Sequence, residues 1–163
     1  MVEKLGVDVG GVIIDRPRDA PAPQTGDTLL SDAVPGAIDG LCRLVNWRFG
    51  HEVYLVSRCG ERVRNETLDW FQKTHFYQLT GIRPDNVHFC RERREKAVIC
   101  ERLSITHFVD DRLEILGYLA EKVGYLYLFR PRPEEIKKFI KFLLRVRCFD
   151  SWKELTDELL KKW

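Results

Sequence analysis

The chain has 163 residues, which is the size of one domain, and its formal net charge is +2 from 27 Lys and Arg against 25 Asp and Glu. Hydrophobic residues make up 44% of the chain, charged residues 32% and aromatic residues 11%, so a disordered main state is excluded. The small net charge also excludes a polycation of the histone kind. Arginine outnumbers lysine 17 to 10, which makes the placement of the arginines informative.

No stretch approaches 18 uninterrupted apolar residues, so we expect no membrane span. The apolar start, Leu5 to Ile14, contains Asp8 and two glycines, which is unlike the core of a signal peptide. The five cysteines include no Cys-x-x-Cys pair, which argues against a disulfide framework or a zinc site. These features together predict a cytoplasmic protein with reduced thiols.

Short apolar runs rich in Val, Tyr and Phe alternate with segments of helical periodicity. The predicted strands are Leu5–Val9, Val53–Val56, Val87–Phe89, Thr106–Val109 and Tyr125–Phe129. The predicted helices lie near residues 35–49, 63–71, 97–103, 113–123 and 134–144, and a capping box at Ser151 and Glu154 opens a last one. This alternation predicts a doubly wound α/β domain, three layers with a parallel sheet of about five strands. We expect one domain over residues 1–163, with a flap loop at 13–34 and C-terminal helices at 133–163.

Functional sites of such sheets lie at the carboxyl ends of the strands. Asp8 follows the first predicted strand and Ser57 the second, while the fourth ends at Asp110 and Asp111. Lys96 opens the helix that leads into the fourth strand. A carboxylate nucleophile, phosphate-binding donors and carboxylates for a hard divalent cation are the groups that phosphoryl chemistry needs.

In the order and spacing of these four motifs, from Leu5 to Phe129, the chain resembles the haloacid dehalogenase (HAD) superfamily of hydrolases. The resemblance implies a Rossmann-like core, an aspartyl-phosphate formed on Asp8, and Ser57 and Lys96 as further catalytic residues. It also implies Mg²⁺ held by Asp8, the carbonyl of Gly10, and Asp110 or Asp111. Expected substrate contacts are Gly10, Gly11, Arg58 and Arg94.

Gly10 departs from the family's pattern, because phosphatases have an aspartate there that protonates the leaving group and then activates water. General acid–base catalysis of this kind contributes about 10²–10⁴-fold. Three hypotheses follow. The chain is an atypical hydrolase of substrates with good leaving groups, or a pseudoenzyme that binds phosphate or another anion, or an enzyme whose acid is displaced, with Asp15 as the nearest candidate.

Each motif residue also has a structural interpretation. Ser57, Asp110 and Asp111 can be N-caps of the helices that follow them. Lys96 lies in the charge run Arg91 to Lys96, which alone is typical of a solvated surface. The functional interpretation therefore rests on the joint placement of the four motifs.

Neither of the family's two cap positions has room for a folded cap. The flap segment at residues 13–34 is too short for one, and only residues 90–95 follow the third predicted strand. Capless members of the family act on macromolecules or borrow a lid from another subunit. The expected partner is thus a phosphorylated or otherwise anionic substrate, macromolecular or not, and no nucleic-acid-binding motif stands out.

Eleven of the seventeen arginines fall in segments that leave the carboxyl edge of the predicted sheet. They are Arg16, Arg18, Arg58, Arg62, Arg64, Arg91, Arg93, Arg94, Arg112, Arg130 and Arg132. Such an arginine-rich rim favours anion recognition. A different class of function is a subunit-interaction module, with Trp163 and the basic helix Lys137, Lys138 and Lys141 as the contact.

Overall fold

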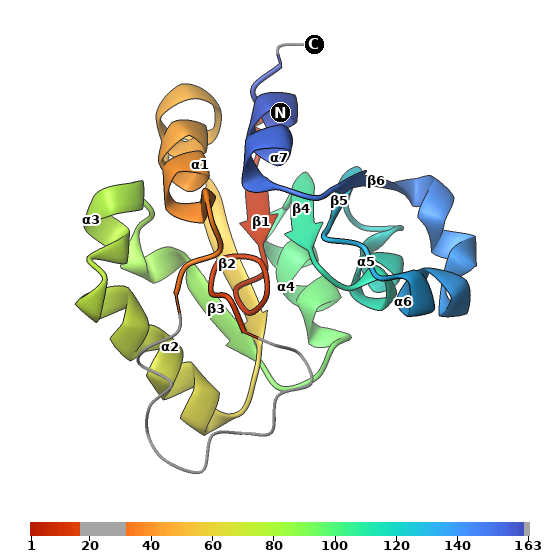
Figure 1. Ribbon diagram of the computed structural model, residues 1–163, viewed down its shortest axis with the longest axis horizontal. Coiled ribbons are helices and arrows are strands. Elements are labelled where there is room, and N and C mark those ends of the chain that lie inside the picture. The colour runs from red at the N-terminus through yellow and green to blue at the C-terminus, as the bar shows by residue number, and fades with distance from the viewer. Residues whose placement is uncertain (17–31, 162–163) are drawn as a thin grey trace.

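The computed structural model describes residues 1–16 and 32–161, which form one parallel six-stranded sheet with helices on both faces (Figure 1). The strand order is β3-β2-β1-β4-β5-β6. The strands are β1 (Leu5–Val7), β2 (Val53–Arg58), β3 (Val87–Cys90), β4 (His107–Asp110), β5 (Tyr125–Phe129) and β6 (Val146–Phe149). The doubly wound α/β prediction is confirmed.

The helices connect successive strands. They are α1 (Ala37–Leu44), α2 (Glu61–Lys73), α3 (Phe76–Thr80), α4 (Glu95–Leu103), α5 (Leu113–Leu119), α6 (Pro133–Lys138) and α7 (Trp152–Leu159). A π-helical turn, Val45–Phe49, extends α1, and 3-10 turns lie at Pro84–Asn86 and Ile140–Arg145. Figure 1 shows α1, α2 and α3 to one side of the sheet and α5 and α6 to the other.

Two apolar cores form because alternate residues of a strand face opposite sides of the sheet. Val109 of β4 and Tyr127 of β5 pack with α1, α2, α3 and α7. Their neighbours Phe108 and Leu126 pack instead with α4 and α5. Strands β1, β2, β4 and β5 are thus largely buried on both faces, which is why their sequences are apolar runs rather than alternating ones.

The C-terminal part differs from the prediction of helices alone, because residues 146–149 form β6. This strand pairs in parallel with β5, in the register Leu126 to Val146 and Phe129 to Phe149. It is a four-residue edge strand whose central residues, Arg147 and Cys148, are exposed. An edge strand with one open side gives no buried apolar run, so the pattern in the sequence was too weak to predict it.

The chain after β1 makes a tight turn, and this turn positions the residues that follow Asp8. Gly10 pairs with Ile14 in an isolated parallel bridge, and Ile14 pairs with Ala33. The indole N–H of Trp152 on α7 donates to the Val12 carbonyl at 2.7 Å, and Trp152 is 1% exposed. The turn is therefore held from the protein core, although most of the predicted flap loop lies outside the described residues.

Only residues 91–94 separate β3 from α4, so the second cap position carries no cap. The first cap position falls largely on residues 17–31, outside the described ranges. Within residues 1–16 and 32–161, no helix has the length and apolar character needed to cross a membrane.

Candidate active site

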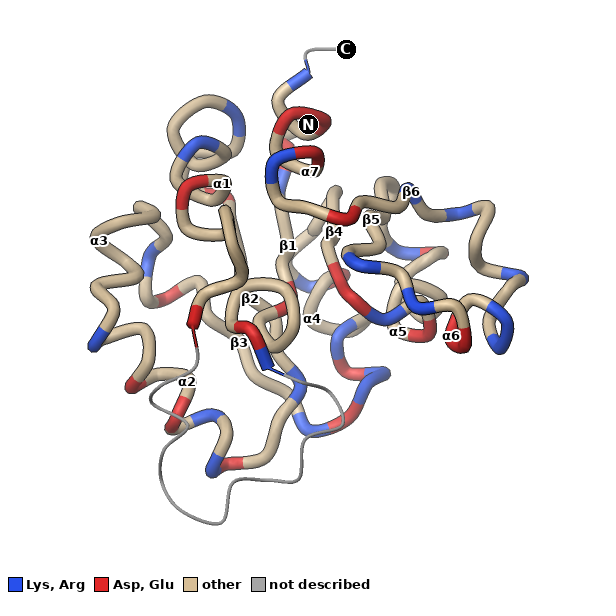
Figure 2. The backbone as a smooth tube through the Cα atoms, in the orientation of Figure 1, with Lys and Arg blue, Asp and Glu red and all other residues tan. Residues whose placement is uncertain are grey.

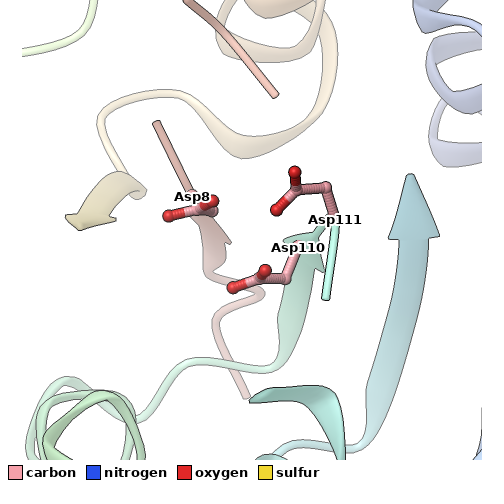
Figure 3. A group of neighbouring side chains, drawn as sticks. All are labelled: Asp8, Asp110 and Asp111. Carbon is pink, nitrogen blue, oxygen red and sulfur yellow. The ribbon is translucent and has the colours of Figure 1, made fainter. Parts of the chain in front are cut away.

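Three carboxylates meet at the carboxyl edge of the sheet. Asp8 follows β1, while Asp110 ends β4 and Asp111 comes next; the Asp8 backbone N–H donates to the Val109 carbonyl at 2.9 Å. Oxygens of the three side chains lie within 4.8 Å of one another, and Figure 3 shows the three groups facing a common space. All three residues are buried, with Asp110 fully enclosed. The expected convergence of these acids is what the structure shows.

Lys96, in the first turn of α4, joins two of these carboxylates. Its Nζ donates to Oδ1 of Asp8 at 2.7 Å and to Oδ2 of Asp110 at 2.8 Å. The lysine is 2% exposed, so it is not part of a solvated charge run. The other oxygen of Asp110, Oδ1, accepts the backbone N–H of Arg112 at 3.0 Å.

The cluster carries more negative charge than one lysine balances. Burial, followed by the charge of Asp110, raises the pKa of Asp8 to about 6, against the opposing effect of Lys96. Burial alone would lower the pKa of Lys96, but the charges of Asp110 and Asp8 outweigh it and raise that pKa. A further cation beside Asp8 would favour its ionised form.

The donor set fits Mg²⁺. Hard divalent cations take carboxylate and carbonyl oxygens, and the three buried carboxylates converge on one space. Gly11 has φ +82, and a Cβ at this position would lie 2.3 Å from Oδ2 of Asp111. The glycine therefore allows the turn after β1 to approach the third carboxylate closely.

A pocket of about 160 Å³ opens beside the carboxylates. Seven of the predicted site residues line it: Asp8, Gly10, Ser57, Arg58, Lys96, Asp110 and Asp111. The prediction did not name six others as site residues: Arg16, Cys59, Val63, Arg93, Arg112 and Ile115. Among the described residues, no histidine lines the pocket.

Arg94 and Gly11, predicted as substrate contacts, are not among the residues that line this pocket. Gly11 instead packs closely against the side chain of Asp111. Arg94 is exposed and is the N-cap residue of α4, whereas its neighbour Arg93 lines the pocket and pairs with Glu114 of α5. The sequence does not give the direction of each side chain at a helix start.

The N-cap interpretations do not hold. The N-cap of α2 is Gly60 and that of α5 is Arg112, so neither Ser57 nor the two aspartates occupies a cap position. Ser57 instead ends β2 at 6% exposure and lines the pocket. Asp15, the candidate for a displaced acid, is exposed and is not among the lining residues.

The arginine rim is only partly directed at the pocket. Arg16, Arg58, Arg93 and Arg112 line it. Arg64 lies over the ring of Phe89 and, with Arg91, lines a second hollow that shares Cys59 with the first. Figure 2 shows basic residues recurring along the segments that follow β2 and β3. Arg18 lies outside the described residues.

No family model matches the chain, and no curated protein matches its sequence. Solved structures do match. D,D-heptose 1,7-bisphosphate phosphatase from B. bronchiseptica, complexed with magnesium and phosphate, has a TM-score of 0.64 at 18% identity, covering 96% of this chain and 98% of its own. The same enzyme from Burkholderia thailandensis gives 0.64 and 18%, with 98% and 99% covered.

A third match is a protein of Burkholderia xenovorans LB400 named as a haloacid dehalogenase-like hydrolase. Its TM-score is 0.54 at 16% identity, covering 77% of this chain and 58% of that one. The chain has the fold of the HAD-like hydrolases. Within this fold Asp8, Ser57, Lys96, Asp110 and Asp111 line one pocket at the carboxyl edge of the sheet.

Proposed function

We propose that the chain is a Mg²⁺-dependent HAD-type hydrolase that uses Asp8 as the nucleophile on a phosphorylated substrate. The observation that carries this proposal is the buried contact of Lys96 with both Asp8 and Asp110 beside a third carboxylate and an open pocket. A lysine buried between two acids contributes little to the stability of the fold, because the cost of desolvating the charges offsets much of their attraction. Such an arrangement is typical of a site that binds or transfers a charged group.

In this proposal Lys96 fixes Oδ1 of Asp8, and the other carboxylate oxygen attacks phosphorus. Ser57 and Arg58, at the end of β2, bind the transferring phosphoryl group. Asp8, Asp110 and Asp111, with the Gly10 carbonyl, would hold Mg²⁺. The ion would supply positive charge for the phosphoryl oxygens and for the acids themselves.

Gly10 gives the site no proton donor at the position where the resemblance places one. A leaving group must then depart as an anion, which is easy for acyl or aryl phosphates and hard for alkyl phosphates. We therefore propose weak turnover of alkyl phosphates and faster turnover of substrates with acidic leaving groups.

The test is a phosphatase panel with Mg²⁺ that includes acetyl phosphate and p-nitrophenyl phosphate. Asp8→Asn keeps the side-chain shape and should lower turnover by more than about 10⁴-fold, as loss of a nucleophile does elsewhere. Asp39→Asn, the same change at an exposed residue of α1, is the matched control and should retain activity. Turnover that survives Asp8→Asn, or none on any substrate, would contradict the proposal.

A second candidate function is a phosphate- or anion-binding protein without turnover, and Gly10 is the observation that favours it. This function predicts that calorimetry detects Mg²⁺ and inorganic phosphate binding while the whole panel stays silent. Asp111→Asn should then weaken Mg²⁺ binding, because it removes one of the three converging carboxylates.

The pocket has no cap among the described residues, so we propose that the substrate is either macromolecular or enclosed by a second subunit. Lys137, Lys138 and Lys141 are exposed on α6 and the turn after it, as a contact surface requires, whereas Trp163 lies outside the described residues.

The five cysteines are all free thiols, which supports the proposed cytoplasmic location.

A further inference from the structure

Arg16 lies beside the position where the site lacks an acid. A Cβ at Gly10 would lie 4.0 Å from Cδ of Arg16, and no closer atom meets it from the other described residues apart from its chain neighbours. The same arginine lines the pocket with Asp8. The space beside residue 10 thus contains the stem of an arginine side chain instead of a carboxyl group.

One nitrogen of the Arg16 guanidinium has a hydrogen-bond partner, and another, Nε, has none among the described residues. Its Nη2 donates to Oγ1 of Thr67 at 3.1 Å, and Thr67 is fully buried on α2. Its Nε is also buried but has no hydrogen-bond partner among residues 1–16 and 32–161. A buried donor without an acceptor is rare in proteins, because it loses its bond to water and gains nothing. An anionic oxygen that reached this nitrogen from the pocket, which Arg16 lines, would supply that acceptor.

The electrostatic surroundings agree with this interpretation. Burial lowers the pKa of Arg16, and the nearby carboxylates of Glu66 and Asp8 act against it. An arginine keeps its charge under such a shift, because its ordinary pKa is above 12. The pocket therefore has a permanent cation that can neither donate nor accept the proton that an acid at position 10 would handle.

We propose that Arg16 is a catalytic residue that stabilises the leaving-group oxygen as an anion, in place of an acid that would protonate it. This inference rests on the proposed hydrolase function and names its substrate class: acyl phosphates, aryl phosphates and phosphoanhydrides. These substrates share a leaving group that is stable as an anion, which is the species that a guanidinium binds. Thr67 is the positioning residue that orients the guanidinium.

The step balances without a proton donor. An oxygen of Asp8 forms a bond to phosphorus, and the bond from phosphorus to the leaving oxygen breaks. The electron pair of that bond stays on the leaving oxygen, which departs as an anion paired with Arg16. Water then attacks the phosphorus of the aspartyl-phosphate, Asp8 leaves as a carboxylate, and one water proton passes to solvent.

The experiment compares acetyl phosphate, p-nitrophenyl phosphate and phenyl phosphate, whose leaving groups become progressively less acidic. Loss of one group that stabilises a developing oxyanion lowers kcat by about 10²–10³-fold. We expect Arg16→Gln to lower kcat by about 10²-fold on phenyl phosphate and by less than about tenfold on acetyl phosphate. Arg112→Gln removes a different arginine from the same pocket. It should lower kcat/KM by one and the same factor on all three substrates.

A chemical rescue separates electrostatic stabilisation from support of the fold. Added guanidinium ion at millimolar concentration should restore phenyl phosphate turnover to Arg16→Ala, and the effect should shrink with the more acidic leaving groups. Thr67→Val, which removes the acceptor of Nη2, should reproduce part of the leaving-group dependence.

Equal losses on all three substrates, or no rescue of Arg16→Ala, would show that Arg16 supports the pocket or the phosphoryl group, and would overturn this inference. Wild-type turnover that depends on Asp8 would still support the proposed function in that case. Failure of the wild type on every substrate would instead refute the proposed function, and this inference with it.

Discussion

Gly10→Asp introduces a carboxyl group into the site, and its effect should depend on Arg16. The change is sterically mild, because the new Cβ would meet Cδ of Arg16 at an ordinary 4.0 Å. Gly10 also lies outside the left-handed region of φ that four other glycines occupy. We therefore expect the variant to fold and to carry its new carboxyl group beside the guanidinium.

The size of the gain follows from two opposing effects. A positioned general acid contributes about 10²–10⁴-fold on a poor leaving group, which is roughly 3–5 kcal/mol. An opposite charge nearby lowers the pKa of a carboxyl group by about 1–3 units. Above that pKa, each unit costs tenfold in the protonated fraction. Gly10→Asp alone should therefore gain about tenfold on an alkyl phosphate, and Gly10→Asp with Arg16→Gln about 10²-fold or more.

The assay is a double-mutant cycle on glycerol phosphate, with kcat measured for the wild type, both single variants and the double variant. We expect Arg16→Gln to lower kcat in the wild-type background and to raise it in the Gly10→Asp background. The activity of Gly10→Asp should also reach its maximum at a lower pH than the activity of the double variant. If Arg16→Gln lowers kcat equally in both backgrounds, the guanidinium and residue 10 do not act on the same leaving group.

Three further predictions concern metal binding and stability. Gly11→Ala should destabilise the fold by about 1–3 kcal/mol and weaken Mg²⁺ binding, because residue 11 has φ +82 and its new Cβ would displace the Asp111 carboxylate. In denaturant titrations run in parallel, the control Gly10→Ala should cost far less stability. The pKa of Asp8 is raised from 3.8 to about 6, so the free energy of unfolding without metal should fall by roughly 3 kcal/mol as pH rises from 4 to above 6. Thermal melts should show a larger stabilisation by Mg²⁺ at pH 7.5 than at pH 5. If the stability of Asp8→Asn depended on pH as steeply as that of the wild type, this prediction would be wrong. Trp152→Phe should cost about 1–3 kcal/mol in urea unfolding, since it leaves the buried Val12 carbonyl without its indole donor, and a cost near zero would argue against that bond.

The order of the motifs along the sequence was enough to predict which side chains meet. Strand ends of a parallel sheet share one edge, so Asp8, Ser57 and Asp110 had to converge once the strands were placed. Lys96 followed because a helix start next to that edge directs a long side chain into it. The resemblance to the HAD superfamily supplies the roles expected of these residues, and the structure brings them together around one pocket.

The parts that were missed depend on side-chain direction and on contacts between distant segments. Arg93 rather than Arg94 lines the pocket because of its direction at the start of α4, which the sequence does not give. The sequence indicates Arg16 only as one arginine of the rim, since its partner Thr67 lies 51 residues away on another element. β6 pairs on one side only, so its sequence lacks the apolar run that marked the other strands.

The replacement at position 10 changes the charge of the pocket as well as its acid–base chemistry. Among the described residues, five cationic side chains and three carboxylates line the pocket, and Glu114 pairs with one of the cations, Arg93, so these groups together carry a formal excess of one positive charge. An aspartate at position 10 would reduce that excess by one, and glycine therefore strengthens the attraction of the pocket for multiply charged anions. The same replacement removes the proton that an alkoxide leaving group needs. Both effects favour anionic substrates whose leaving group departs as an anion. Tight anion binding and slow turnover of alkyl phosphates are therefore expected together. Kinetics across leaving groups, rather than affinity, is the measurement that separates an enzyme from a binding protein at this site.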